Sequence, residues 1–109
     1  TVGFSDDDLA KYNSLKAELY PKAADAYYTK GKSDFLSKNM TEAKTDLETA
    51  LKYASNENFV DDIYYYLGQI AEGEKDMASA KKYYNKIISD YPDSNQIGNA
   101  RNALEGLKE

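Results

Sequence analysis

Residues 64–92, YYYLGQIAEGEKDMASAKKYYNKIISDYP, predict a hairpin of two short α-helices. The polar run at residues 73–76 separates one apolar segment from the next. Asp76 belongs to a residue type that caps helix N-termini well, so we expect the second helix to begin there. Pro92 cannot continue a helix because it has no backbone N–H, so we expect the hairpin to end before it.

Each helix of this hairpin carries residues suited to close packing. Ala80, Tyr84 and Ile87 follow one another at steps of four and three residues, which places them on one helical face. Gly68 in the first helix and Ala80 in the second are small, so we expect the two backbones to approach closely where the helices cross.

The pattern resembles the tetratricopeptide repeat (TPR), a helical hairpin that recurs with a period of about 34 residues. The residues at the family's spacing are Tyr64, Leu67, Gly68, Ala80, Tyr84, Ile87 and Pro92. Two positions depart from the pattern. Asp61 stands where Trp or another large apolar residue is usual, and Ala71 stands where Tyr or Leu is usual.

An earlier part of the chain repeats the hairpin 37 residues upstream. The matching residues there are Tyr27, Tyr28, Gly31, Lys38, Met40, Ala43 and Lys44. Because this displacement exceeds the family's period by roughly three residues, we expect the extra residues in the polar stretch 56–58. In the first repeat, Lys30 stands where Leu is usual and Asp34 stands where an aromatic residue is usual. These two residues could instead form an i,i+4 pair on the helix surface.

At 109 residues the chain predicts a single all-α domain, a TPR-like right-handed solenoid of about six helices. The expected repeats span about 24–57 and 61–94, with flanking helices at about 6–20 and 95–108. We expect the first helix to end at Tyr20, because Pro21 disfavours the helical conformation in the residue before it. One apolar stripe on this helix is formed by Leu9, Tyr12, Leu19 and either Leu15 or Lys16.

Further helix starts are predicted from capping residues. Ser5 is expected to cap the first helix, and Ser94 the last one. Asn39, with Glu42 three residues later, predicts a capping box. We expect the helix that it starts to run to about Ala54.

Composition excludes several classes of function. The chain has neither His nor Cys and no Gly-rich phosphate loop, so we expect no enzyme activity, no cofactor and no metal site. The run at residues 6–8 is three aspartates without the spacing of a calcium-binding EF-hand loop. A net charge of −5 argues against nucleic acid as a partner, and no apolar stretch is long enough to insert into a membrane.

The resemblance implies a binding surface, because the first helices of successive TPR hairpins line a concave groove. The corresponding residues here are Asp25, Tyr28, Lys32 and Phe35 in the first repeat, and Asp62, Tyr65, Gln69 and Glu72 in the second. Tyr28 and Tyr65 hold the same position in the two repeats, so we expect them to stand side by side in the groove. Packing of both rings against neighbouring helices is the alternative.

The family resemblance favours a module that binds a protein or peptide partner. One TPR subset binds C-terminal carboxylates through Lys, Arg and Asn, but Asp25 and Asp62 make this groove acidic and favour a basic or neutral partner. The alternatives are a structural or self-associating domain, which would form a homo-oligomer, and a glycan-binding domain, against which the absence of Trp counts.

The Tyr-Pro-Asp-Ser sequence at residues 91–94, followed by a helix rich in Ala and Leu, resembles TPR proteins of bacterial envelopes. Together with the absence of Cys, this leads us to expect an extracytoplasmic bacterial domain. The chain starts at Thr1 rather than Met, from which we expect a processed form or a piece of a longer protein.

Overall fold

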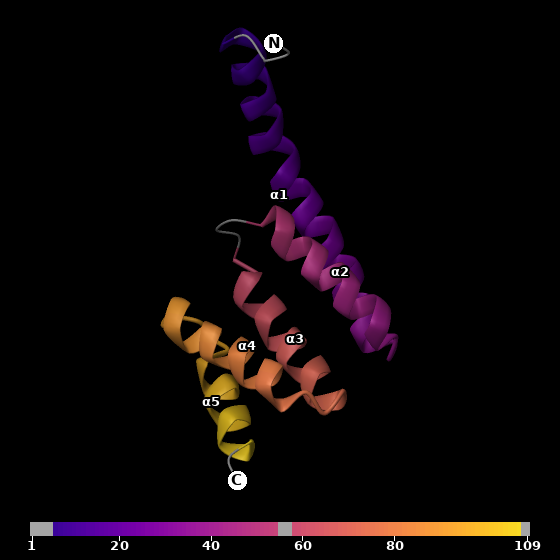
Figure 1. Ribbon diagram of the computed structural model, residues 1–109, viewed down its shortest axis with the longest axis vertical. Helices are drawn as coiled ribbons and strands as arrows, with labels where there is room; N and C mark the ends of the chain where they lie inside the picture. The colour runs from indigo at the N-terminus through magenta and orange to yellow at the C-terminus, as the bar shows by residue number, and fades with distance from the viewer. Residues whose placement is uncertain (1–5, 55–57, 108–109) are drawn as a thin grey trace.

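The computed structural model describes residues 6–54 and 58–107, with side chains from residue 9 onward. These residues form five α-helices: α1 (Asp6–Leu36), α2 (Met40–Tyr53), α3 (Val60–Gly73), α4 (Met77–Asp90) and α5 (Ile97–Gly106). The all-α prediction is confirmed, while six helices is one too many. The molecule is elongated, with extents of 56 × 29 × 27 Å (Figure 1). The predicted cap Ser5 and the loop residues Asn56 and Glu57 lie outside the described residues.

Two helical hairpins and a final helix build two adjoining cores. The later half of α1 pairs with α2, α3 pairs with α4, and α5 packs on α4. The first core contains the buried residues Ala24, Ala43, Leu47, Ala50, Phe59, Ile63, Leu67 and Ile70, and the second contains Ala71, Ala80, Tyr84, Ile87 and Ala100. The predicted face of Ala80, Tyr84 and Ile87 on α4 is therefore buried as a unit.

A glycine sits at the closest approach within each hairpin. A Cβ atom added at Gly68 would lie 2.5 Å from Cε1 of Tyr84, and one added at Gly31 would lie 2.7 Å from Cγ of Leu47. Tyr84 and Leu47 are completely buried, so neither can move aside easily. Both glycines are needed because their helices pack on a large side chain of the partner helix.

The turns of the two hairpins are also built alike. Lys38 and Lys75 both adopt the left-handed conformation, with φ of 69° and 63°. In each turn the amide of this lysine and the next amide donate to carbonyls of the preceding helix, at N···O distances of 2.8 to 3.1 Å. This is the Schellman arrangement that ends many helices. The same turn thus recurs at the displacement of 37 residues seen in the sequence.

Helix capping follows the prediction at one of three places. Asp76 caps α4, accepting a hydrogen bond from the amide of Ser79 at 3.1 Å, as predicted. Asn39 precedes α2 but its side chain accepts no capping hydrogen bond, although its backbone (φ −87°, ψ 70°) closely matches that of Asp76 (φ −93°, ψ 78°). Ser94 does not cap α5 either, since that helix begins three residues later, at Ile97, with Gln96 at the capping position.

Pro21 lies inside α1, so the predicted helix end at Tyr20 is wrong. The Tyr20 ring packs edge-on against Tyr53 of α2, with centroids 5.0 Å apart, and the ammonium group of Lys16 lies 5.3 Å from the same ring. These contacts keep Tyr20 helical against the preference imposed by the following proline. The proline still removes the hydrogen bond that a residue at this position would donate to the carbonyl of Ala17.

Replacing Pro21 by Ala is expected to raise the free energy of unfolding by about 1–3 kcal/mol, because proline in an exposed helix interior is about 3 kcal/mol less favourable than alanine. Urea unfolding followed by circular dichroism measures the change. Lys22→Ala, at the exposed neighbouring residue, is the control and should be close to neutral. A Pro21→Ala protein no more stable than the wild type would indicate that the helix breaks at Pro21.

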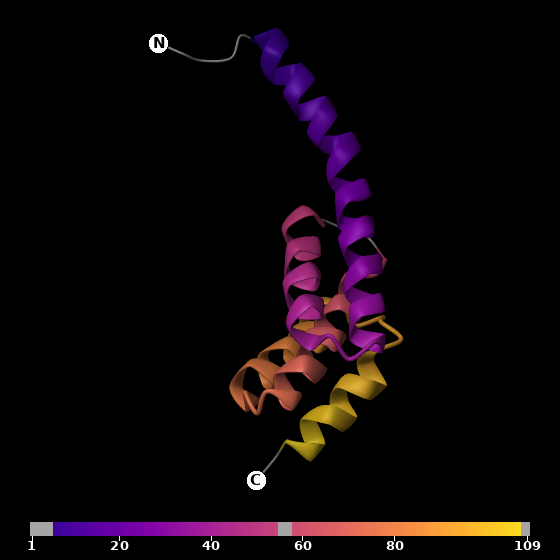
Figure 2. The ribbon, with the colours of Figure 1, turned by 90° about the vertical axis from the view of Figure 1, so that its right-hand side faces the viewer.

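The first half of α1 extends beyond the rest of the described chain (Figure 2). A helix of 31 residues is about 46 Å long, whereas the 14 residues of α2 cover about 21 Å. The ring of Tyr53, at the end of α2, lies against Tyr20 and Tyr27 of α1. The portion of α1 before Tyr20 therefore overhangs its hairpin partner. Tyr27 itself is 37% exposed.

Candidate functional site

The helices on which the predicted groove residues lie are joined by a short series of hydrogen bonds. The hydroxyl of Tyr28 in α1 donates to Oδ2 of Asp62 in α3, at 3.5 Å. Nε2 of Gln96, just before α5, donates to the other oxygen of Asp62 at 2.8 Å, and Nδ2 of Asn99 donates to Oε1 of Gln96 at 3.0 Å. This polar ladder, formed by Tyr28, Asp62, Gln96 and Asn99, ties α1, α3 and α5 together.

Gln96 and Asn99 were missed as members of this surface. Gln96 lies 34 residues after Asp62, and Asp62 lies 34 residues after Tyr28. Extending the family's period of about 34 residues beyond the second hairpin would have pointed to Gln96.

Tyr28 makes both an aromatic stacking contact and a hydrogen bond. Its ring stacks on Phe59 with centroids 4.6 Å apart and planes inclined by 4°. Burial, followed by the negative charge of Asp62, raises the pKa of the Tyr28 hydroxyl to about 12. The hydroxyl therefore stays protonated at neutral pH and acts as the donor to Asp62. Burial and the charge of Asp62 likewise raise the pKa of Tyr66.

Tyr65 has a different set of neighbours. Its hydroxyl accepts a hydrogen bond from Nε2 of Gln69 at 2.8 Å, and its ring lies 6.0 Å from that of Tyr84 and 6.5 Å from that of Tyr66. The structure thus gives Tyr65 ring neighbours in α3 and α4, whereas Tyr28 stacks on Phe59. The expected side-by-side pairing of the two tyrosines is not among these ring contacts.

Two family models match this chain, both described as the tetratricopeptide repeat. One matches residues 24–57, which include the later half of α1 and all of α2, and the other matches residues 62–94, across α3 and α4. The chain belongs to the tetratricopeptide repeat family. Neither the curated proteins nor the solved structures contain a match to it at a significant level.

In TPR terms, α1 and α3 are the first helices of the two repeats, and of the eight predicted residues on them two are exposed and six are half-buried. Asp25 and Lys32 are exposed on α1, and Tyr65 and Gln69 are half-buried on α3. Phe35 is turned toward the ring of Tyr66, 4.9 Å away. We define these first four residues, Asp25, Lys32, Tyr65 and Gln69, as the open groove face.

Glu72, the last predicted residue, forms a hydrogen bond within the second TPR hairpin. Its carboxylate accepts a hydrogen bond from the hydroxyl of Tyr84, which lies in α4 and is completely buried. Burial, followed by this hydrogen bond and the charge of Glu72, raises the pKa of Tyr84 well above its usual range. Glu72 therefore provides the partner for a buried hydroxyl at the boundary between α3 and α4.

The structure also accounts for the acidic residue at a TPR position that is usually large and apolar. Asp61 accepts a hydrogen bond from Oγ of Ser94, and this hydroxyl in turn accepts one from the amide of Gln96 at 2.9 Å. Asp61 thus fixes the loop before α5, and with it the position of Gln96. In this chain a hydrogen bond replaces the apolar contact typical of the family.

The raised tyrosine pKa values predict alkaline instability of the TPR domain. Because Tyr28 titrates near 10 when unfolded and at about 12 when folded, its contribution to stability is complete below pH 10. It is lost as the pH rises from 10 through 12. We expect the melting temperature to fall over this interval, and to fall less in Tyr28→Phe. Thermal unfolding at pH 8 to 11.5 measures both, and an equally steep fall in Tyr28→Phe would contradict this assignment.

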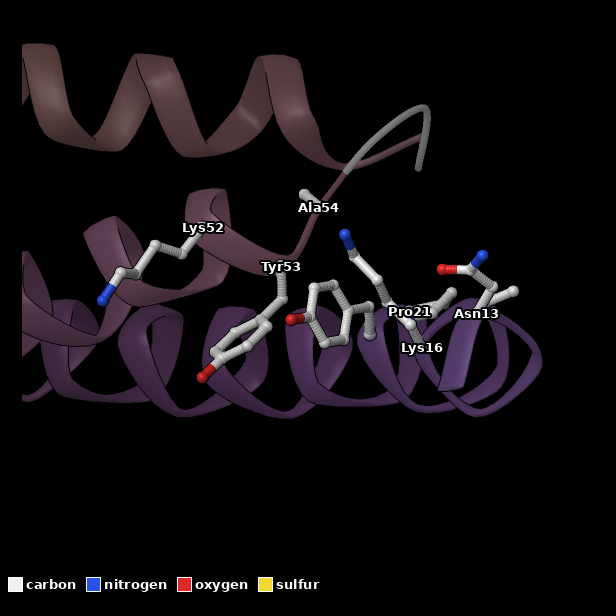
Figure 3. A pocket seen from close by; sticks show the side chains of 8 residues that line it. Asn13, Lys16, Pro21, Lys52, Tyr53 and Ala54 are labelled. Atoms are coloured by element: carbon white, nitrogen blue, oxygen red, sulfur yellow. The ribbon is translucent and has the colours of Figure 1, made fainter. Parts of the chain in front are cut away.

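A hollow of about 540 Å³ lies where the overhang of α1 meets the end of α2. Figure 3 shows Lys16 and Lys52 among the residues that line it, with Tyr53 between them. The Lys52 side chain extends away from Lys16, so the two ammonium groups do not converge on a single anion (Figure 3). The hollow is therefore a weak candidate for a small-molecule site.

Among the described side chains, those of residues 9–54 and 58–107, no three acidic groups are placed together to hold a metal ion, and acidic groups are the only potential ligands of that kind there. None of the helices within residues 6–54 and 58–107 combines the length and the apolarity needed to cross a membrane.

The i,i+4 surface pair considered for Lys30 and Asp34 does form, with an N···O distance of 3.2 Å, and Lys30 also pairs with Asp46 at 2.7 Å.

Proposed function

We propose that this TPR domain, acting as one unit over residues 1–109, binds a protein or peptide segment across α1, α3 and α5. The observation that carries the proposal is the polar ladder. It links these helices through groups that hydrogen-bond to one another, while the open groove face on α1 and α3 includes the exposed side chains of Asp25 and Lys32. A preformed surface of this kind loses little conformational entropy when a partner binds.

Charge indicates the kind of partner. Asp25 is exposed on the open groove face, Asp62 lies on the adjacent helix, and the whole chain carries a net charge of −5. A positively charged segment would be attracted to this surface and an acidic one repelled, whereas a neutral segment would meet no charge repulsion. The amide of Gln69 and the ring of Tyr65 supply polar and aromatic contacts for such a segment.

Selection from a library of random twelve-residue peptides displayed on phage, with the purified protein as bait, tests the proposal. We expect enrichment of neutral or basic peptides that bind with micromolar affinity in calorimetry. Asp25→Lys should weaken binding of a basic peptide about tenfold or more, because it replaces attraction with repulsion at the surface.

The matched control is Glu48→Lys on α2, which changes the net charge equally at an exposed residue of a second helix. It should leave the affinity within about twofold, since only long-range charge differs. Gln69→Ala should weaken binding without unfolding the domain. Peptides whose affinity falls equally in Asp25→Lys and Glu48→Lys, or a library without enrichment, would contradict the proposal.

A further inference from the structure

An exposed apolar stripe runs along the overhanging half of α1. Leu9, Leu15 and Leu19 are 47%, 54% and 53% exposed, and the ring of Tyr12 lies on the same helical face. Figures 1 and 2 show that this half of the helix projects away from the hairpins. Large apolar side chains repeated on one face of a helix normally pack against another helix.

We propose that this stripe pairs with the stripe of a second copy of the chain, in antiparallel orientation. The spacing suits helix pairing, because Tyr12, Leu15 and Leu19 follow one another at steps of three and four residues, as core positions of a coiled coil do. Such positions meet their equivalents in a partner helix through interlocking side chains.

The charges that flank the stripe favour a second copy as the occupant. Lys11 and Glu18 are exposed, and since seven residues separate them they lie on the same flank of the stripe. When two identical helices pack antiparallel about a two-fold axis, each flank of one helix faces the same flank of the other helix. Lys11 of each chain then approaches Glu18 of the other, which gives two reciprocal ion pairs.

The opposite flank argues against the parallel orientation. Lys16 is exposed on that side, five residues after Lys11. In a parallel pair, the flanking residues that face each other are separated by five residues, so Lys11 would approach Lys16 of the other copy. Like charges at these positions disfavour pairing, which leaves the antiparallel arrangement.

The size of the stripe sets the expected strength. Four half-exposed side chains from each copy bury less than the roughly 1,200 Å² at which the usual range of stable complexes begins. We therefore expect a reversible dimer with a dissociation constant of roughly 10–500 μM. Such a dimer uses a surface of α1 that is separate from the open groove face.

Sedimentation equilibrium of the full chain at 20 μM to 1 mM tests the proposal. The wild-type mass should rise toward twice the monomer mass, and Leu15→Lys should remain monomeric over the same range. Leu36→Lys is the matched control, because Leu36 is 67% exposed at the other end of the same helix. It should dimerise like the wild type, with circular dichroism confirming that all three proteins are folded. Should Leu15→Lys be unfolded, Leu19→Lys, at another exposed position of the stripe, takes its place.

Lys11→Glu separates the two orientations. In the antiparallel pair the new carboxylate of each copy lies near Glu18 of the other and should weaken dimerisation at least threefold, whereas in a parallel pair it would oppose Lys16 and strengthen dimerisation. Mixing Lys11→Glu with Glu18→Lys should restore a heterodimer of wild-type affinity. A constant monomer mass up to 1 mM overturns the proposal. It is overturned in the same way if the protein stays monomeric and the stripe binds anionic lipid vesicles instead. Dimerisation of Leu15→Lys or of Leu19→Lys at wild-type strength overturns it as well.

Discussion

Replacing Tyr84 by Ala is expected to lower the free energy of unfolding by about 3–5 kcal/mol, the largest loss for any single change considered. The Tyr84 side chain is completely buried at the centre of the second core, where it fills the space left by Gly68. Its removal leaves a cavity that the surrounding helices cannot close fully. Urea unfolding followed by circular dichroism at 222 nm, which reports helix content, gives the change directly.

Tyr84→Phe is the control that separates the ring from the hydroxyl. It keeps the packing and removes only the hydrogen bond to Glu72, which is half-buried and can be hydrated in its place. We expect a loss of about 1 kcal/mol for this change. Equal losses in Tyr84→Ala and Tyr84→Phe would show that the hydroxyl rather than the packing stabilises the hairpin.

The second large effect is expected for Gly68→Ala, which should destabilise the domain by about 1–3 kcal/mol through overpacking. The added methyl group would lie 2.5 Å from Cε1 of Tyr84, a ring enclosed on all sides. The matched control is Gly73→Ala in the same helix, where a methyl group would meet no atom within 4 Å outside its own stretch of helix backbone. That change should be neutral or stabilise by up to about 1 kcal/mol, because alanine favours helix more than glycine does.

A double substitution tests whether the two effects share one cause. In Gly68→Ala/Tyr84→Ala, the added methyl group enters the space that the missing ring leaves. The loss should therefore be smaller than the sum of the two single losses, by about 1 kcal/mol or more. Strictly additive losses would show that Gly68 matters for a reason other than the approach of Tyr84.

The hairpins were predictable because their determinants are local and repeat along the chain. The spacing of Ala80, Tyr84 and Ile87 needs only the helical period, and Asp76 caps α4 through a contact three residues away. The same displacement of 37 residues relates Gly31 to Gly68 and the turn lysines to each other. A pattern that occurs twice constrains the fold more strongly than either copy alone.

The errors arose where distant contacts outweigh a local preference. Pro21 favours a helix end, yet the packing of Tyr20 on Tyr53 keeps α1 continuous. A sequence does not reveal that contact, because the two tyrosines lie 33 positions apart and meet only when α1 and α2 have paired.

The candidate site shows the same division. The helical period and the family's groove positions placed the eight predicted residues on α1 and α3, but they did not show which side chains pair within the protein. Glu72 is committed to Tyr84 and Tyr28 to Asp62, whereas Asp25 and Lys32 are exposed. These pairings depend on how the helices pack, because the partners come from other helices.

The most direct test of groove binding is an NMR titration of the ¹⁵N-labelled domain with a peptide from the phage selection. Binding across the first helices predicts the largest chemical-shift changes in residues 24–36 of α1, in α3 and in α5, including the side-chain amides of Gln69 and Gln96. Shifts concentrated in α2 and α4, with these amides unchanged, would contradict binding in the groove.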